Sequence, residues 1–285
     1  MNTFVLDFVS IGPQRTGTSW LHQILKQHPQ ICCPQDVKET MFFDRDYAKG
    51  ITWYADYFCH QHQGQICGEV APTYFDVAAI PDRIHAVNPN CKILISLRHP
   101  VGRALSLYHH HLSKGRVQGS FSQAVIQMPR IIEAGRYATH IPRWLDRFDP
   151  GQLLFLLLED IESDPVSVLH NVYRFLNIQP IDVPALGYEK FGAATMPTYP
   201  QLAKIAAQGA TWLRRRRLHK LAEWGKAWGL KRVYAGQAAH LPKLTLHESA
   251  HLLEQYQIDI RFVEQLLHRD LAGWRDPSTA STYSL

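Results

Sequence analysis

The stretch GPQRTGTSW, residues 12–20, connects a predicted strand to a predicted helix. Residues 4–11 are apolar and rich in strand-forming side chains, and residues 19–27 carry apolar side chains at helical spacing. A glycine-containing loop in this position directs backbone N–H groups and the positive end of the helix dipole toward one point. The stretch therefore predicts a site for a phosphate or a similar anion, with a plain helix-starting turn as the structural alternative.

The loop resembles the nucleotide P-loop pattern G-x-x-x-x-G-K-[ST] but differs in its cation. Thr18 stands where that pattern has the lysine that contacts the β- and γ-phosphates, and the cation of the loop is Arg15. This difference argues against an enzyme that uses a magnesium-bound nucleoside triphosphate. It favours a donor that carries a different second group on its 5′-phosphate.

Strand and helix signals alternate along residues 1–178. Further strands are predicted over 66–70, 92–97 and 153–158, and further helices over 101–113 and 165–177. Strands that are apolar on both faces and separated by helices are typical of a parallel sheet covered on both sides. We predict an α/β fold with a P-loop-like parallel sheet flanked by helices.

The pattern changes after residue 178. A long ordered loop over 179–200 is predicted to cover a site, and a basic helix is predicted over 208–229. Thr245 and Glu248 form a capping-box pattern before a last helix that runs to about residue 271. We predict one domain over residues 1–285, with an α/β core (1–178) and a loop and helical C-terminal region (179–275).

Composition narrows the class of protein. With 46% hydrophobic and 19% charged residues the chain can form a core, and its net charge of +5 is too small for a protein that coats nucleic acid. Its five cysteines form no even disulfide framework, its start reads as a strand rather than a signal peptide, and no apolar run approaches the length of about 18 residues that a membrane span needs. We expect a cytoplasmic protein with reduced thiols, without a nucleic-acid partner or an integral membrane segment.

A second motif, RHPVGRALSLY at residues 98–108, follows the third of these predicted strands. Because ligands of parallel α/β sheets bind at the carboxyl ends of the strands, we expect Arg98 to face the same crevice as the loop at 12–20. A guanidinium there, with the Ser106 hydroxyl on the next helix, suits a second phosphate of the same ligand. Taken alone, both side chains also fit purely structural roles.

Together the two motifs resemble the 5′-phosphosulfate loop and the 3′-phosphate motif of sulfotransferases that use 3′-phosphoadenosine 5′-phosphosulfate (PAPS). The similarity is to the heparan-sulfate-type branch and its bacterial relatives. It extends to the segments ETMFFD (39–44), KGITWY (49–54), EVAPTYF (69–75), YATHIPRW (137–144) and LHRDLAGW (267–274).

The resemblance implies a function and assigns residues to it. It implies transfer of the sulfuryl group from PAPS to a hydroxyl or amine of a saccharide or small natural product, leaving adenosine 3′,5′-bisphosphate. It implies that Glu39 is the catalytic base and Arg15 the electrostatic stabiliser, and that no metal is required. The implied donor-binding residues are Arg15, Thr16, Gly17, Thr18, Ser19 and Trp20 for the phosphosulfate, and Arg98 and Ser106 for the 3′-phosphate.

The chain departs from the family pattern at three places. Arg15 stands where the family often has a lysine thought to act on the leaving oxygen; because arginine does not give up its proton, we expect Arg15 to act by charge alone. Val70 stands where the heparan 3-O enzymes have a lysine beside the acceptor. The histidine base of the small-molecule cytosolic enzymes has no clear counterpart, which makes Glu69 a second candidate in the acceptor cleft.

Several other features stay open at this point. His109 to His111 and the group Cys59, His60, His62 and Cys67 match no closed zinc pattern, although one of the three consecutive histidines could face the nucleotide. Arg214 to Arg217 fit an exposed helix face, a contact with substrate phosphates, or a membrane surface. Two rival functions remain: a P-loop ATP-dependent kinase, with Glu159 or Asp160 as its strand-end carboxylate, and a non-catalytic protein that binds a nucleotide or polyanion.

Overall fold

The computed structural model describes residues 4–182, 205, 208–209 and 241–277. The chain divides into two compact units. The first comprises Met1–Arg98, Arg136–Gly192 and Ile258–Leu271, and the second comprises His99–Gly135, Ala193–Gln257 and Ala272–Leu285.

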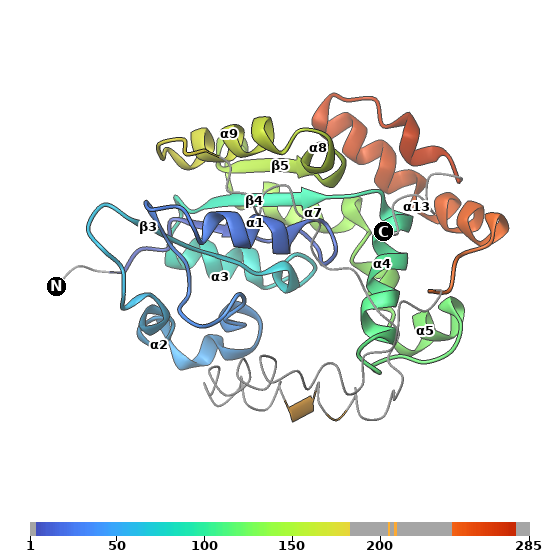
Figure 1. The fold of residues 1–285 in the computed structure, drawn as a ribbon, viewed down its shortest axis with the longest axis horizontal. Coiled ribbons are helices and arrows are strands. Elements are labelled where there is room, and N and C mark those ends of the chain that lie inside the picture. Colours follow the sequence, from blue (N-terminus) through green and yellow to red (C-terminus); the bar gives the residue numbers. More distant parts are fainter. Residues whose placement is uncertain (1–3, 183–204, 206–207, 210–240, 278–285) are drawn as a thin grey trace. The chain divides into compact units, whose positions relative to one another are not determined.

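The first unit is built on a five-stranded sheet in the order β2-β3-β1-β4-β5, with parallel pairing throughout (Figure 1). The predicted parallel sheet is thus confirmed. The sequence did not predict β2, because two residues are too few to form a recognisable strand pattern. The strands are β1 (Phe8–Ser10), β2 (Ile31–Cys32), β3 (Ile66–Val70), β4 (Lys92–Leu97) and β5 (Leu153–Leu157).

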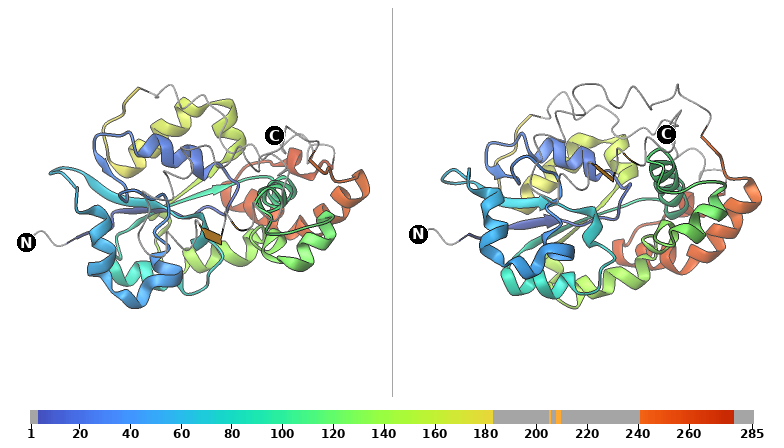
Figure 2. Two further views of the ribbon diagram at one scale, coloured as in Figure 1. Left: turned by 60° about the horizontal axis from the view of Figure 1, so that its bottom comes forward. Right: turned by 90° about the horizontal axis from the view of Figure 1, so that it is seen from below.

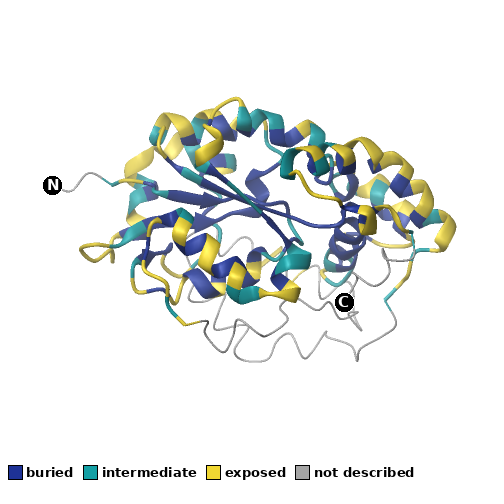
Figure 3. Ribbon diagram, turned by 90° about the horizontal axis from the view of Figure 1, so that it is seen from above, coloured by how far each residue is buried: buried dark blue, intermediate teal, exposed yellow. Residues whose placement is uncertain are grey.

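Helices cover both faces of this sheet (Figure 2). On one face, Leu21 and Ile24 of α1 and Val172 of α9 pack with Phe8 and Leu94 of the sheet in one hydrophobic cluster. Helices α3 and α7 lie on the opposite face. Most strand residues are consequently buried, as Figure 3 shows and as their continuous apolar sequence predicts. The helices of this unit are α1 (Thr18–Leu25), α2 (Ile51–Ala55), α3 (Ile80–Val87), α7 (Tyr137–Leu145), α8 (Leu158–Ser163) and α9 (Pro165–Leu176).

The ends of α9 follow the signals in the sequence. The Asp164 side chain accepts a hydrogen bond of 3.1 Å from the Ser167 N–H at the start of the helix. Asn177 closes the other end in the left-handed conformation, with φ 59°. The helix predicted over 165–177 is therefore confirmed to within one residue.

The second unit contains α4 (Pro100–Leu112), α5 (Phe121–Gln127), α6 (Arg130–Glu133) and the first part of α13 (Leu246–Leu267). His99 is the N-cap of α4, where its Nδ1 accepts a hydrogen bond of 3.2 Å from the Gly102 N–H. The predicted capping box of α13 is confirmed, since Glu248 accepts hydrogen bonds of 2.8 Å from the Thr245 N–H and hydroxyl. Although the last helix was expected to reach about residue 271, α13 ends at Leu267.

Some expectations fall outside the described residues. These are the predicted basic helix over 208–229 with Arg214 to Arg217, except residues 208–209, and most of the predicted loop over 179–200. All five cysteines lie in the described part of the chain and carry free thiols. No helix among the described residues is both long enough and apolar enough to span a bilayer.

Candidate active site

The loop between β1 and α1 leaves the start of α1 open to a ligand. Gly17 is the N-cap in a left-handed conformation, with φ 86°, and it carries no side chain that could cap the helix. Arg15 is also left-handed, with φ 77°. The N-cap residue thus makes no side-chain capping hydrogen bond, and a helix start of this kind is suited to bind an anion.

Strand β4 holds this loop in place. The Thr16 hydroxyl is fully buried, donates a hydrogen bond of 2.7 Å to the carbonyl oxygen of Pro13, and lies 2.8 Å from the Ser96 hydroxyl on β4. Gly12 lies so close to the same residue that a Cβ added to it would stand 2.2 Å from Ser96 Oγ and 2.5 Å from Ser96 N. The sequence motif identified the loop, but not Ser96 as the residue that fixes it.

We expect Gly12→Ala to destabilise the protein by about 1–3 kcal/mol, because the new methyl group cannot fit without moving the loop or the β4 backbone. Urea unfolding of the two proteins would measure this change. Gly151→Ala is the matched control, since a Cβ there would meet no atom within 4 Å. Equal free energies of unfolding for both variants would contradict the close packing of the loop on β4.

Arg98 follows β4 and reaches the loop. Its Nη1 donates a hydrogen bond of 3.2 Å to the carbonyl oxygen of Arg15. Arg98 is only 5% exposed. Its Nε is buried and has no hydrogen-bond partner among the described residues. Burial, together with the nearby charge of Arg15, lowers the pKa of Arg98 to about 10, although Glu159 and Glu162 oppose this shift. A buried cation with an unused N–H group, next to an open helix start, is suited to an anionic ligand.

Glu39 lies beside the same loop through its neighbour Lys38. The Lys38 ammonium is 3.3 Å from the hydroxyl oxygens of both Thr18 and Ser19, and 3.8 Å from Glu39 Oε1. Burial and the charge of Arg15 lower the pKa of Lys38, while Glu39 raises it. The Lys38 ammonium thus lies near Thr18 and Ser19 of the loop and near Glu39, although no sequence motif had singled out Lys38. The roles of Arg15 and Glu39 stay predictions.

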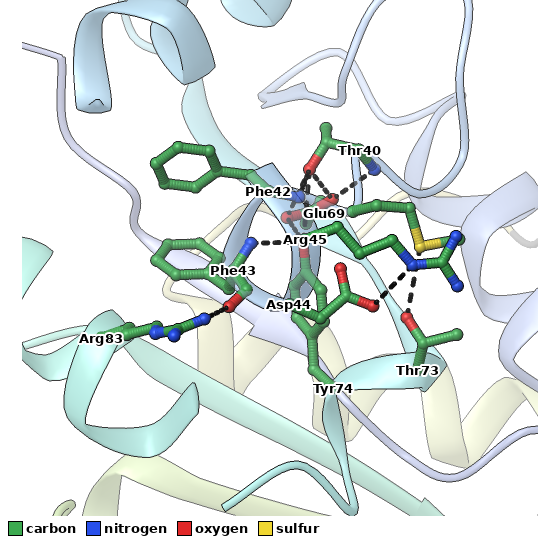
Figure 4. Close-up of polar contacts among 10 residues, drawn as sticks. Thr40, Phe42, Phe43, Asp44, Arg45, Glu69, Thr73, Tyr74 and Arg83 are labelled. Atoms are coloured by element: carbon green, nitrogen blue, oxygen red, sulfur yellow. Dashed lines mark hydrogen bonds and ion pairs between the residues drawn. The ribbon is translucent and has the colours of Figure 1, made fainter. Parts of the chain in front are cut away.

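Glu69 does not fit the role of a second acceptor-cleft carboxylate that its sequence position suggested. The residue is 0% exposed, and its carboxylate accepts hydrogen bonds from the Thr40 N–H (3.0 Å), the Tyr54 hydroxyl (2.9 Å) and the Tyr74 hydroxyl (3.0 Å). The Thr40 hydroxyl donates to the same group (Figure 4). Because Thr40 follows Glu39 directly, the buried carboxylate fixes the backbone that carries the predicted base.

The chain after Thr40 is a short π-helix, η1 (Phe42–Asp46), and it too is held from several sides. The Phe43 N–H donates a hydrogen bond of 3.3 Å to the Tyr74 hydroxyl, and the Arg83 guanidinium donates to the Phe43 carbonyl oxygen (Figure 4). π-Helical turns are rare in proteins as a whole, and those that occur often lie at functional sites. The segment that follows Glu39 is therefore a fixed part of the site.

Two further residues predicted to bind the donor are Trp20 and Ser106, and both are buried. The Trp20 side chain lies in the hydrophobic cluster between α1 and the sheet. Ser106 is buried on α4 in the second unit, so its pairing with Arg98 at a 3′-phosphate stays a prediction.

The histidine and cysteine groups form other contacts. The Nε2 of His109 lies 2.8 Å from the carbonyl oxygen of Pro242, and the Nε2 of His60 lies 3.6 Å from the Cys32 sulfur. The Cys59 sulfur lies 3.8 Å from Gln35 Oε1. No three His, Cys, Asp or Glu side chains in the described ranges gather in a way that could hold a metal ion.

The carboxylates proposed for a kinase have their own surroundings in α8. Asp160 forms a two-pronged pair with the Arg269 guanidinium, at 2.6 and 2.8 Å. Glu159 acts on Arg98, whose pKa its charge raises. Asp160 is thus engaged by an arginine rather than presented to a magnesium ion.

A family model described as the sulfotransferase domain matches residues 6–185, which include the loop, Glu39 and Arg98. The chain belongs to the sulfotransferase family. Curated relatives include a bifunctional heparan sulfate N-deacetylase/N-sulfotransferase of Drosophila melanogaster, 32% identical over 61% of this chain and 20% of that protein. Another is the heparan sulfate glucosamine 3-O-sulfotransferase 3A1 of Mus musculus, 35% identical over 61% of this chain and 46% of that protein. The sulfotransferase chain described here thus matches less than half the length of either relative.

The fold of this sulfotransferase-family chain also matches a solved structure. A crystal structure of a sulfotransferase from Alicyclobacillus acidocaldarius superposes with a TM-score of 0.70 at 23% identity. The match covers 96% of this chain and 100% of that chain. The predicted P-loop-like α/β fold is thereby confirmed.

Proposed function

We propose that the protein is a PAPS-dependent sulfotransferase in which both compact units belong to one domain over residues 1–285. The 5′-phosphosulfate of the donor binds at residues 15–20, and the 3′-phosphate binds at Arg98 and Ser106. Glu39 removes the proton of the acceptor as its oxygen or nitrogen attacks sulfur. The S–O bond to the 5′-phosphate breaks, and its electron pair leaves with adenosine 3′,5′-bisphosphate.

The observation that carries this proposal is the Arg98 guanidinium, which is buried against the loop with an unused Nε–H group. Together with the start of α1, where Gly17 makes no side-chain cap, it would supply cation and N–H groups for a ligand with more than one anionic group. Thr18 in place of the P-loop lysine, and Asp160 paired with Arg269, make a magnesium-dependent kinase a weaker fit.

The acceptor is proposed to be a saccharide hydroxyl or amine. The two relatives described above act, by their names, on heparan sulfate, one as an N-sulfotransferase and one as a glucosamine 3-O-sulfotransferase. A small natural-product acceptor is the second possibility. A glutamate base serves either kind, since both lose one proton to the same carboxylate.

The test compares thermal stabilisation by adenosine 3′,5′-bisphosphate with that by magnesium-ATP, followed by transfer of labelled sulfate from PAPS to desulfated heparan sulfate, glucosamine and 4-nitrophenol. A larger shift with the bisphosphate, and label in at least one acceptor, supports the proposal. Preference for magnesium-ATP contradicts it and favours a kinase. Bisphosphate binding without transfer to any of the three acceptors favours a non-catalytic binding protein.

Arg98→Met is expected to weaken bisphosphate binding about 10- to 100-fold, because it removes a charge-assisted hydrogen bond from a buried site. Isothermal titration calorimetry would measure the affinity, and Arg98→Lys should lie between the variant and the wild type. Arg174→Met, at an exposed position of α9, is the control. If Arg98→Met binds the bisphosphate as the wild type does, Arg98 does not hold the donor.

A further inference from the structure

We propose that Lys38 is a further catalytic residue, whose ammonium group contacts the sulfuryl group of the donor during transfer. This inference rests on the proposed function. The sequence motif assigned electrostatic stabilisation of the transfer to Arg15, the cation of the loop, alone. Lys38 lies outside the loop and on a different segment of the chain.

The position of the ammonium group is the first argument. It stands 3.3 Å from Thr18 Oγ1 and 3.3 Å from Ser19 Oγ, the hydroxyls of the first two residues of α1. These residues are proposed to bind the phosphosulfate, so a group that contacts both hydroxyls lies within reach of an anion bound there. The same ammonium is 3.8 Å from Glu39 Oε1. Lys38 therefore lies between the donor loop and the proposed base, where the sulfuryl group must pass.

The chemistry of the two nearby cations is the second argument. Arg15 has the loop position, but its guanidinium keeps its protons and is itself partly withdrawn from solvent, which lowers its pKa. Lys38 has a compact charge with three donors that can follow the moving sulfuryl oxygens. Burial and the charge of Arg15 lower the pKa of Lys38, and the neighbouring Glu39 carboxylate acts against this shift.

The reaction step is balanced without an additional reactant. The acceptor oxygen or nitrogen forms a bond to sulfur, and its proton goes to the Glu39 carboxylate. The bond between sulfur and the bridging oxygen breaks, and the electron pair stays on the 5′-phosphate of the leaving bisphosphate. Lys38 remains protonated and stabilises the negative charge that develops on the sulfuryl and bridging oxygens.

The experiment compares wild type, Lys38→Met and Lys38→Arg, with Lys26→Met at the exposed end of α1 as the matched control. Calorimetry gives the affinities for PAPS and for adenosine 3′,5′-bisphosphate, which lacks the sulfuryl group. Turnover is measured on whichever of desulfated heparan sulfate, glucosamine and 4-nitrophenol the wild type uses fastest. Lys38→Met is expected to lower kcat about 100-fold and to weaken PAPS binding more than bisphosphate binding. Lys38→Arg should recover part of the loss, and Lys26→Met should match the wild type.

Three outcomes overturn the inference. If Lys38→Met keeps the wild-type kcat and PAPS affinity, Lys38 does not contact the sulfuryl group, although the proposed function stands. If it weakens PAPS and bisphosphate binding equally while kcat is unchanged, Lys38 acts only by shaping the loop. If the wild type binds neither PAPS nor the bisphosphate, the proposed function fails and the role of Lys38 fails with it.

Discussion

Replacing Glu39 by Gln is expected to lower kcat about 1,000-fold while leaving the affinity for adenosine 3′,5′-bisphosphate close to that of the wild type. The amide has nearly the shape of the carboxylate but cannot take the acceptor proton. Glu39 lies beside the loop, with its Oε1 3.8 Å from the Lys38 ammonium, whereas the bisphosphate is proposed to bind through the loop and Arg98. Loss of the base should therefore affect the chemical step and not product binding.

Steady-state kinetics with labelled PAPS, together with calorimetry, separates these two effects. Glu254→Gln on the exposed side of α13 is the matched control and should leave both values unchanged. Glu39→Asp, which keeps the carboxylate but draws it back by one methylene, should retain more activity than the amide. Two results would contradict the role of Glu39 as base: full kcat in Glu39→Gln, or loss of bisphosphate affinity as large as the loss of kcat.

The parts of the site that the strand pattern predicted are those that directly follow a strand. The loop, the start of α1 and Arg98 follow strands, and in a parallel sheet the carboxyl ends of neighbouring strands lie at one edge. The pairing of β1 with β4 brings Arg98 to the Arg15 carbonyl oxygen for that reason. The strand pattern alone was therefore enough to place these two residues together.

The parts that the sequence missed depend on contacts between segments far apart in the chain. Lys38 reaches the start of α1 from a stretch without a clear period, and Ser96 is one polar residue in an apolar strand. Glu69 was predicted as a second candidate in the acceptor cleft because the histidine base of the small-molecule cytosolic enzymes has no clear counterpart in this sequence. Its actual role depends on Tyr54 and Tyr74, whose hydroxyls bury it, and no spacing in the sequence indicates that they converge.

The buried Glu69 carboxylate leads to the second large expected effect, which concerns stability and pH. Burial raises the pKa of Glu69 to about 7, although the hydrogen bonds from Thr40, Tyr54 and Tyr74 act in the opposite direction. The pKa values of both tyrosine hydroxyls are raised, mainly by their burial, so they remain neutral donors in this range. Between the ordinary pKa of 4.5 and the raised one, the folded protein thus holds a proton that the unfolded chain releases.

The sign of the effect follows from that difference in proton binding. The contribution of Glu69 to stability is fully present below pH 4.5 and is lost as the pH rises through about 7, because deprotonation is then easier in the unfolded chain. A shift of this size corresponds to about 3 kcal/mol. Gln does not titrate, so Glu69→Gln should lack this decline. The free energy of unfolding of the wild type, relative to Glu69→Gln, is expected to fall by about 3 kcal/mol between pH 4.5 and 8.

Urea unfolding of both proteins across this pH range measures the difference directly, and subtracting the two curves removes the titration of all other groups that behave alike in both. Glu254→Gln again serves as the control, since an exposed carboxylate should give a curve parallel to the wild type. A Glu69→Gln curve parallel to the wild type would mean that Glu69 titrates alike in the folded and unfolded chain. It would also weaken the assignment of Glu69 as the buried anchor of Thr40, because a carboxylate with access to water would not depend on those three donors.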